Sequence, residues 1–576
     1  MLSGSKIRKR GAGLVRSLAS RLSSPRDEAL VSAAEASYVL VTGQKPKVGI
    51  STRQEPHVDR GAFRRAESAI DAGDAERAIA GVDQLYRDYP GSVRVLRLRR
   101  GVLQRTGDLR GQAAMLHEIH RLDDSPETRL SERRVLGRLN EMTPGWLPRI
   151  PGRQPVTPEA DNVILHLNKE SSPYLTTGFT MRSRYNLIAA RDAGLRPVIV
   201  TALGFPRLLG ITSFPAMEIV DEMPHYRLDL GPNYPLDRPM DQILEDQAWL
   251  TARVARQVRP AIIHASSGHR GFEHALIGLA LRDHIDRPLV YEVRSVFEAS
   301  WASDADWAEA GDQYQLRFDT ETRTMRAADH VLVISEVMRD ELIERGVDPA
   351  RLTVFPNAID PEVFSPRPPD PALQARYGIN GHYTFGYVSL IDHPREDHEL
   401  LMDATRELRR RGRRVRCLII GDGKRRAELE RYAKRTGAAK DVVFTGHVPH
   451  DEVASHYALL DAFVVPRKDE RAARMVTPLK PYEALAMARP MVIADLPPLR
   501  EIANPEERGL AYTPGDLDGL ASALERLMDD PELAQRIATQ GHDWVVRERR
   551  WAANGAILRD VYKDVLERWA ARQNAA

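Results

Sequence analysis

The chain has 576 residues, 42% of them hydrophobic, and its 83 basic and 81 acidic side chains give a net charge of +2, a balance that does not support nucleic-acid binding by the chain as a whole. The single cysteine, Cys417, excludes an intramolecular disulfide and suits a cytoplasmic protein. We find no apolar stretch long enough to span a bilayer and expect no secretory signal, and the length predicts about three or four domains.

Residues 1–55 are predicted to be a basic tail and linker. The basic side chains there alternate with apolar ones: Lys6, Arg8, Lys9, Arg10, Arg16 and Arg21, with Leu14, Val15, Leu18 and Leu22. Two interpretations stay open. The segment is either a solvated, disordered tail or a short amphipathic helix on an anionic membrane surface.

Residues 56–145 are predicted to form a helical, repeat-like region. Gly73-Asp74 recurs as Gly107-Asp108, a spacing of 34 residues, with alanines nearby. That period resembles tetratricopeptide repeats, although the aromatic positions of the repeat are mostly missing. An ordinary pair of helical hairpins is the alternative, and in either case we expect this region to carry no chemistry and to offer a surface to a protein partner.

Short apolar runs separated by helical patterns predict two α/β domains, at 160–365 and 366–550. In the first we expect strands at 163–167, 197–200, 261–264, 289–293 and 330–335 and helices at 181–193 and 320–328. In the second we expect strands at 384–388, 416–420, 441–444, 462–465 and 491–493. This alternation is typical of doubly wound parallel sheets with helices on both faces, and two such domains leave a cleft between them. An apolar stripe predicts a terminal helix over residues 551–576.

The stretch V-T-P-L-K-P-Y-E-A-L-A, from Val476 to Ala486, is the most informative motif in the chain. It places Lys480 and Glu483 at the start of an apolar helix. A lysine there neutralises phosphate charge, and a carboxylate one turn later accepts hydrogen bonds from paired hydroxyls. A nucleotide sugar carries both groups. The alternative is a charge pair on a solvated surface.

A series of motifs, taken in order, is similar to that of the family 4 glycosyltransferases, which have the GT-B architecture of two Rossmann-like domains facing a cleft. The resemblance covers roughly residues 163–565. The matching stretches are H-A-S-S at His264, V-Y-E-V-R at Val290, A-D-H-V-L-V-I-S-E at Ala328, V-F-P-N-A-I-D-P-E-V-F at Val354, L-I-I-G-D-G-K at Leu418, V-V-F-T-G-H-V-P at Val442, D-A-F-V-V-P-R at Asp461 and T-P-L-K-P-Y-E-A-L-A at Thr477. The T-P-L-K variant resembles members found around bacterial exopolysaccharide synthesis.

The resemblance implies a retaining hexosyltransferase that needs no metal and no cofactor. The nucleotide-sugar donor would bind the second domain, and a glycan or lipid-linked acceptor would bind mainly the first. The terminal helix at 551–576 would cross back to the first domain, the alternative being a helix that packs only on its own domain. The implied catalytic residues are Lys480, Arg395 and His264. The implied donor-binding residues are Gly178, Gly423, Gly446, Val448, Leu479 and Glu483. For Arg395 a surface salt bridge, for Gly423 a simple turn and for His264 a structural role stay open as alternatives. The protein would be cytoplasmic, with peripheral contact to the inner membrane face as a further expectation.

Two positions depart from the family pattern. Relatives commonly carry a glutamate eight residues before the ribose-binding one, where this chain has Met475. They also often have a second histidine where this chain has Ser266. Both departures concern the transferred sugar rather than the nucleotide. A catalytically weakened scaffold that organises polysaccharide assembly is therefore the alternative function, and a nucleotide-sugar epimerase is a minor third.

Overall fold

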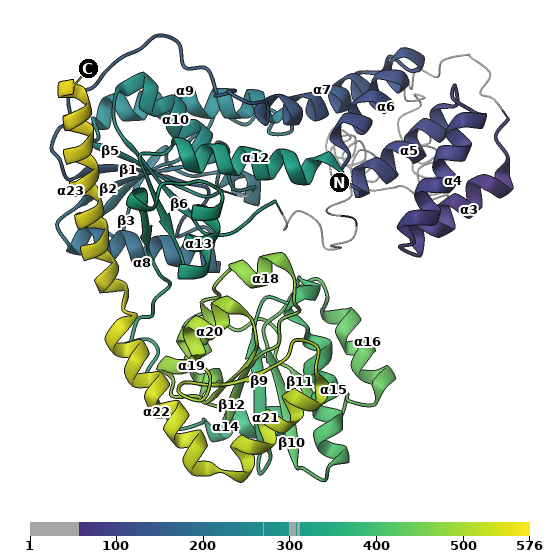
Figure 1. The fold of residues 1–576 in the computed structure, drawn as a ribbon, viewed down its shortest axis with the longest axis vertical. Helices are drawn as coiled ribbons and strands as arrows, with labels where there is room; N and C mark the ends of the chain where they lie inside the picture. The colour runs from purple at the N-terminus through teal and green to yellow at the C-terminus, as the bar shows by residue number, and fades with distance from the viewer. Residues whose placement is uncertain (1–56, 269, 299–306, 308–310, 576) are drawn as a thin grey trace, which may run out of the picture.

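The computed structural model describes residues 57–298 except 269, together with 307 and 311–575. The predicted tail at 1–55 lies outside the described residues. Two α/β lobes stand one above the other in Figure 1, and a helical region extends sideways from the first lobe. The last two helices of the chain run along the side of the lobes, α22 (Pro531–Glu548) beside the second lobe and α23 (Trp551–Ala575) beside the first (Figure 1).

The helical region consists of α3 (Arg60–Asp71), α4 (Ala75–Asp88), α5 (Val93–Arg105), α6 (Leu109–Leu122) and α7 (Pro126–Glu141). The two Gly-Asp pairs lie at the α3–α4 and α5–α6 turns. Gly73 and Gly107 have positive φ, and Asp74 and Asp108 cap the helices that follow. The 34-residue spacing therefore marks two helical hairpins, while their assignment to tetratricopeptide repeats stays a prediction.

The helical region docks on the first lobe through α12 (Asp312–Ala327). The carboxylate of Asp312 accepts a hydrogen bond from the backbone N–H of Leu109 at 2.7 Å and pairs with Arg110 at 3.0 Å. The backbone of Gly311 lies directly against Gly107, where a Cβ would approach a backbone atom to 2.3 Å. This close approach fixes the hairpins to the lobe.

The first lobe has an eight-stranded sheet in the order β3-β4-β2-β1-β5-β6-β7-β8. Its strands are β1 (Val163–Asn168), β2 (Arg196–Thr201), β3 (Met217–Val220), β4 (Met223–Tyr226), β5 (Ile262–Ser266), β6 (Leu289–Val293), β7 (His330–Val333) and β8 (Leu352–Val354). Its helices besides α12 are α8 (Gly178–Asp192), η1 (Arg207–Leu209), α9 (Met240–Val258), α10 (Glu273–Ile285), α13 (Glu336–Glu344) and η2 (Pro349–Arg351). Every described pairing in this sheet is parallel except β3–β4, so the prediction of a parallel sheet missed an antiparallel edge hairpin.

The α8 helix begins three residues earlier than the 181–193 pattern predicts. Thr177 and Thr180 form a capping box, in which each side chain accepts a hydrogen bond from the backbone N–H of the other. This satisfies two N–H groups that would otherwise lack a partner at the helix start. Gly178 therefore opens the helix and is not part of a loop.

The second lobe has a six-stranded sheet in the order β11-β10-β9-β12-β13-β14, and all of its described pairings are parallel. This is the doubly wound order in which the two halves diverge from a central pair, here β9 and β12. The strands are β9 (Tyr383–Val388), β10 (Val415–Ile420), β11 (Val442–Phe444), β12 (Ala462–Val465), β13 (Met491–Ala494) and β14 (Leu510–Tyr512). The helices are α14 (Pro371–Tyr377), η3 (Pro394–Glu396), α15 (His398–Arg410), α16 (Arg426–Thr436), α17 (Val453–Tyr457), α18 (Arg471–Met475), α19 (Lys480–Ala486), α20 (Pro497–Ala503), α21 (Leu517–Asp529) and α22 (Pro531–Glu548).

The terminal helix α23 (Trp551–Ala575) returns to the first lobe and packs along α8. Its Leu558, Val561, Tyr562 and Val565 form one apolar cluster with strand residues of the first sheet. Tyr185 of α8 stacks on Trp551 with ring centroids 5.5 Å apart. Among the described helices, none combines the length and the apolar character that crossing a bilayer requires.

At Gly555, α23 lies so close to α8 that a side chain would not fit. A Cβ on Gly555 would meet the carbonyl oxygen of Ala189 at 2.2 Å, whereas a Cβ on Gly101, in α5, would meet open space. Gly555→Ala should therefore displace α23 and destabilise the protein by about 2 kcal/mol. Gly101→Ala should stabilise its helix by about 0.5–1 kcal/mol. Thermal unfolding and hydrogen exchange of α23 measure both effects, and unchanged protection of α23 in Gly555→Ala would contradict this packing.

Asp397, at the start of α15, gives the second lobe a pH-dependent stability. Burial raises the pKa of its carboxyl from 3.8 to about 6. The folded state then binds a proton more tightly than the unfolded state, so this group's contribution to stability is present below pH 4 and is lost as the pH rises to about 6. Asp397 has a φ of +42°, which asparagine tolerates. The advantage of Asp397→Asn over the parent should therefore grow from pH 4 to pH 6 and reach about 1–2 kcal/mol. A difference in unfolding temperature that does not vary with pH would contradict this account.

Candidate active site between the two lobes

Each sheet has one point where the strand order reverses, and both points are lined by polar residues. In the first lobe this point lies between β1 and β5, and in the second between β9 and β12. Ligands of doubly wound sheets bind at the carboxyl ends of the strands at such points. The chain thus builds one candidate half-site on each lobe.

The half-site of the first lobe is a cavity of about 80 Å³ at the ends of β1, β5 and β6. Asn168 closes β1, and both polar atoms of its side-chain amide are buried with no hydrogen-bond partner among the described residues. Phe179 and Phe297 add aromatic faces to an otherwise polar lining. The remaining lining residues are Lys169, Glu170, Thr180, Ser183, Ser266, Ser267, Gly268 and Arg294.

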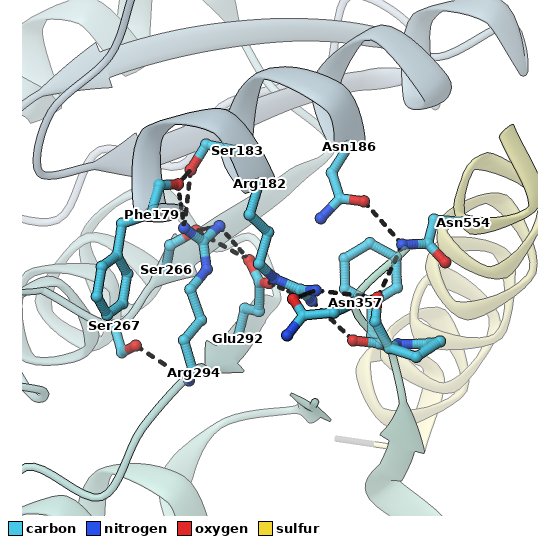
Figure 2. Close-up of polar contacts among 12 residues, drawn as sticks. Phe179, Arg182, Ser183, Asn186, Ser266, Ser267, Glu292, Arg294, Asn357 and Asn554 are labelled. Carbon is cyan, nitrogen blue, oxygen red and sulfur yellow. Dashed lines mark hydrogen bonds and ion pairs between the residues drawn. The ribbon is translucent and has the colours of Figure 1, made fainter. Parts of the chain in front are cut away.

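Behind this cavity lies a buried charge network centred on Glu292 of β6. Figure 2 shows Arg294 on one side of it and Arg182 on the other, with Arg294 reaching toward Ser183 and Phe179 on α8. Arg294 approaches the Glu292 carboxylate to 2.5 Å, and Arg182 approaches it to 2.8 Å. Burial raises the pKa of Glu292, but the two guanidinium groups outweigh burial and hold it well below its ordinary value. The carboxylate is therefore ionised and paired on both sides.

Ser266 occupies the position where relatives often have a second histidine. Its hydroxyl donates to the Glu292 carboxylate at 3.1 Å and accepts from Arg294 at 2.9 Å. The substitution therefore places a small hydroxyl in the charge network, in a position that also lines the cavity.

His264 lies within β5 between α23 and the charge network, with its Nε2 3.6 Å from the Glu292 carboxylate. Its Nδ1 is 2.6 Å from the hydroxyl of Tyr562, and its ring stacks on His166 at 4.7 Å between centroids. Burial lowers the pKa of His264, which keeps the imidazole neutral. This environment favours the structural role that the sequence left open over the catalytic one.

The half-site of the second lobe is built around α19, whose first residue is Lys480. Lys480 is half-buried, and among the described residues none forms an ion pair with it. Glu483, one turn later, accepts a hydrogen bond from the Tyr457 hydroxyl at 2.7 Å. Tyr457 thereby fixes the direction of the carboxylate, and within the described part of the chain no hydrogen bond reaches its other oxygen. Because α19 has only seven residues, the positive charge here comes mainly from the lysine and not from the helix dipole.

The loop before α19 is held by two side chains from different parts of the chain. Arg467, just after β12, donates to the carbonyl oxygen of Val476 at 2.9 Å. Asn357, in the segment that leaves the first lobe, donates to the carbonyl oxygen of Thr477 at 2.8 Å. The conformation of this loop therefore depends on both lobes.

Gly178 and Leu479, both predicted to bind the donor, face each other across the lobes. A Cβ on Gly178 would lie 3.5 Å from a methyl group of Leu479. Gly178 opens α8, and Leu479 immediately precedes α19. The structure thus brings the starts of both helices to one place, while the contact of these two residues with a donor stays a prediction.

Arg395 follows β9 on η3, at the switch point of the second sheet. Its Nε lies 3.6 Å from Glu396, which is longer than a hydrogen bond. The main partner of Glu396 is instead Arg467, at 3.2 Å. Burial raises the pKa of Glu396, but Arg467 outweighs it and lowers the pKa to about 2. Arg395 therefore forms the surface ion pair that the sequence left open, without a hydrogen bond from its guanidinium to any described residue, and its contact with a phosphate stays a prediction.

Three predicted donor-binding residues remain: Gly423, Gly446 and Val448. A Cβ on Gly423 would come within 2.4 Å of the backbone of Ile391, so packing between two loops explains the glycine and supports the turn that the sequence left open. Gly446 has a φ of +76° and pairs with Gly421 in an isolated bridge. Val448 is half-buried nearby. The predicted contact of Gly446 and Val448 with a nucleobase stays a prediction.

The position without the family glutamate ends the short helix α18. Met475 is its last residue, and the upstream carboxylate Asp469 forms an exposed ion pair with Arg474. Arg471 starts α18 and reaches the first lobe, where it pairs with Glu298 at 3.0 Å and Glu341 at 2.5 Å. In this chain α18 therefore carries an ionic contact between the lobes.

Several residues that shape the site were missed from the sequence: Arg182, Glu292, Arg294, Tyr457 and Arg467. Three of them lie within matched family motifs: Glu292, Arg294 and Arg467. Each is a charged residue in or just after an apolar strand run, and this unusual placement could have identified them. Arg182 and Tyr457 lie on helices and carry no such signal, because their partners come from distant segments.

Comparison with known proteins matches both lobes. Residues 181–358 match the family described as "Glycosyl transferase 4-like domain", and residues 382–530 match "Glycosyl transferases group 1". An α-D-kanosaminyltransferase of Streptomyces kanamyceticus is 26% identical over half of this chain and 71% of its own length. A second relative is a GDP-mannose-dependent α-(1-6)-phosphatidylinositol monomannoside mannosyltransferase of Mycolicibacterium smegmatis. It is 29% identical over 41% of this chain, and the match spans only 62% of the relative's own length.

Solved structures agree in fold. A sucrose-phosphate synthase from Thermosynechococcus elongatus superposes with a TM-score of 0.58 at 20% identity, covering 70% of this chain and 99% of that one. The structure of HepE of Anabaena in complex with UDP superposes with a TM-score of 0.54 at 17% identity. The superposition covers 70% of this chain and 99% of HepE. At these identities the likeness shows the fold, which is GT-B. The two lobes are therefore the paired domains of a glycosyltransferase, and the chain is a transferase enzyme of this type.

Proposed function

We propose that the protein transfers a sugar from a nucleoside-diphosphate donor to a glycan or lipid-linked acceptor, with retention of configuration at the anomeric carbon. The observation that carries this proposal is the pair Lys480 and Glu483: a cation with no ion-pair partner among the described residues, beside a carboxylate that Tyr457 orients. Relatives named for transfer of kanosaminyl and GDP-linked mannosyl groups support the substrate class.

The donor would lie across the starts of α8 and α19. As the bond to the sugar breaks, negative charge grows on the diphosphate, and a fixed cation stabilises that charge more in the transition state than in the ground state. Lys480 and Arg395 would supply it, and Glu483 would accept hydrogen bonds from the ribose hydroxyls. Because these side chains provide the countercharge, we propose that transfer needs no resident metal.

The acceptor would occupy the cavity of the first lobe. Its polar lining and the two aromatic faces of Phe179 and Phe297 suit a hydroxylated ring. The cavity lies at the switch point of its own sheet, at the edge where α8 begins. We propose no identity for the acceptor beyond this chemical class.

Lys480 and Glu483 can be tested separately because each should recognise a different part of the donor. Lys480→Met should weaken binding of nucleoside diphosphates by about 10–100-fold and bring their affinity down to that of the nucleosides. Glu483→Gln keeps an acceptor for Tyr457 and should abolish the preference for ribose over 2′-deoxyribose. Calorimetric titration with UDP, GDP and ADP, their nucleosides and their 2′-deoxy forms measures both. Lys434→Met, on the exposed face of α16 in the same lobe, is the matched control and should bind as the parent does.

Two results would decide against the proposal. If the parent protein binds none of the three nucleoside diphosphates, the donor class is wrong. If it binds one of them but releases no nucleoside diphosphate from any sugar donor, the weakened-scaffold alternative is favoured. Met475 and the paired Asp469 are the observations that keep this second function in view.

A further inference from the structure

Asn357 is a buried amide that makes contacts on opposite lobes. It lies in the crossing segment, by which we mean the stretch that leads from the end of β8 to the second lobe. The residue is 3% exposed. Its Oδ1 accepts a hydrogen bond from the Nη1 of Arg182 on α8 at 2.8 Å. Its Nδ2 donates to the carbonyl oxygen of Thr477 at 2.8 Å. An amide side chain can serve both partners at once, because its oxygen accepts from the guanidinium while its NH₂ group donates to the carbonyl.

The two hydrogen bonds of Asn357 link the lobes, and the partner in the first lobe, Arg182, is held rigidly. Arg182 is 3% exposed and pairs with Glu292, and it also donates to the carbonyl oxygens of Phe355 at 2.7 Å and Pro356 at 2.9 Å. Figure 2 shows its guanidinium between Glu292 and Asn357. Because a buried guanidinium without these acceptors would be costly, its position is strongly determined.

The end in the second lobe is the loop that leads into Lys480. Two successive carbonyl groups of this loop are held from different sides: Val476 by Arg467 of the same lobe, and Thr477 by Asn357. The hydroxyl of Thr477 is buried and has no hydrogen-bond partner among the described residues. Thr477 lies three residues before Lys480, so rotation of its peptide group would move the start of α19.

We infer that Asn357 is a positioning residue for the donor site, because it transmits the placement of Arg182 in the first lobe to the loop before Lys480. This inference rests on the proposed function. The loop takes its nucleotide-binding shape only while the crossing segment is seated between the lobes. Asn357 itself does not touch the donor, and separation of the lobes must break one of its two hydrogen bonds.

The chain offers a matched control for this link. Asn554 of α23 is 2% exposed and binds the same crossing segment through the carbonyl oxygen of Pro356 at 3.1 Å, together with Asn186 at 2.8 Å. It makes no described contact with the loop before Lys480. Figure 2 shows it on the opposite side of the crossing segment from Glu292.

The test compares Asn357→Asp and Asn357→Ala with Asn554→Asp and Asn554→Ala in the full chain. Asn357→Asp keeps an acceptor for Arg182 but loses the donated hydrogen bond to Thr477, and Asn357→Ala adds no buried charge and serves if the aspartate variant fails to fold. Calorimetric titration with the nucleoside diphosphate that binds the parent, and thermal unfolding, are measured for each. Both Asn357 variants should bind it about tenfold more weakly, and the Asn554 variants should stay within about twofold of the parent.

In the Asn357 variants, the affinity for the nucleoside diphosphate must fall further than it does in Asn554 variants of equal stability. If Asn357 and Asn554 variants that lose the same unfolding temperature also lose the same affinity, the role of Asn357 is structural and the inference is wrong. Parent-like affinity in the Asn357 variants overturns it as well. A parent protein that binds no nucleoside diphosphate would instead defeat the proposed function, so the two failures are distinguishable.

Discussion

The architecture of this site depends on how one buried arginine is neutralised. Arg182 belongs to the first turns of α8, and its guanidinium pairs with Glu292 and donates to backbone carbonyl groups of the crossing segment. A guanidinium removed from water must keep all of its partners, because an uncompensated buried charge costs several kcal/mol. This requirement ties α8, the end of β6 and the connection between the lobes into one unit. The cavity of the first lobe and the loop of the second are both built on that unit.

The lobes are also joined by ionic contacts farther from the crossing segment. Arg471 of α18 pairs with Glu298 and Glu341 of the first lobe, and Glu501 of α20 accepts from the backbone N–H of Val337 at the start of α13 at 2.7 Å. Burial raises the pKa of Glu298, but nearby guanidinium groups lower it below its ordinary value, so the carboxylate is ionised when paired. Polar contacts of this kind let two domains meet and separate more readily than a large apolar interface does.

The sequence predicted the fold more completely than the site. Apolar strand runs such as 163–167 and 289–293 come from burial on both faces of a sheet and can be recognised locally, whereas β3 and β4 are short and partly exposed and lack that signal. Lys480 and Glu483 were found because one helix turn carries both. Asn357 could be identified only as part of the matched stretch at Val354, since its partners Arg182 and Thr477 are 175 and 120 residues away in the chain. His264 shows the converse: its motif suggested chemistry, but its partners Tyr562 and His166 come from distant segments that the motif does not reveal.

A crystal structure of the full chain with a nucleoside diphosphate bound would test the central claim most directly. The account predicts the diphosphate between the starts of α8 and α19, within hydrogen-bonding distance of the Lys480 ammonium, the ribose hydroxyls on Glu483, and the bond between Asn357 and Thr477 intact. A nucleotide bound elsewhere, or Lys480 and Glu483 directed away from it, would contradict the account.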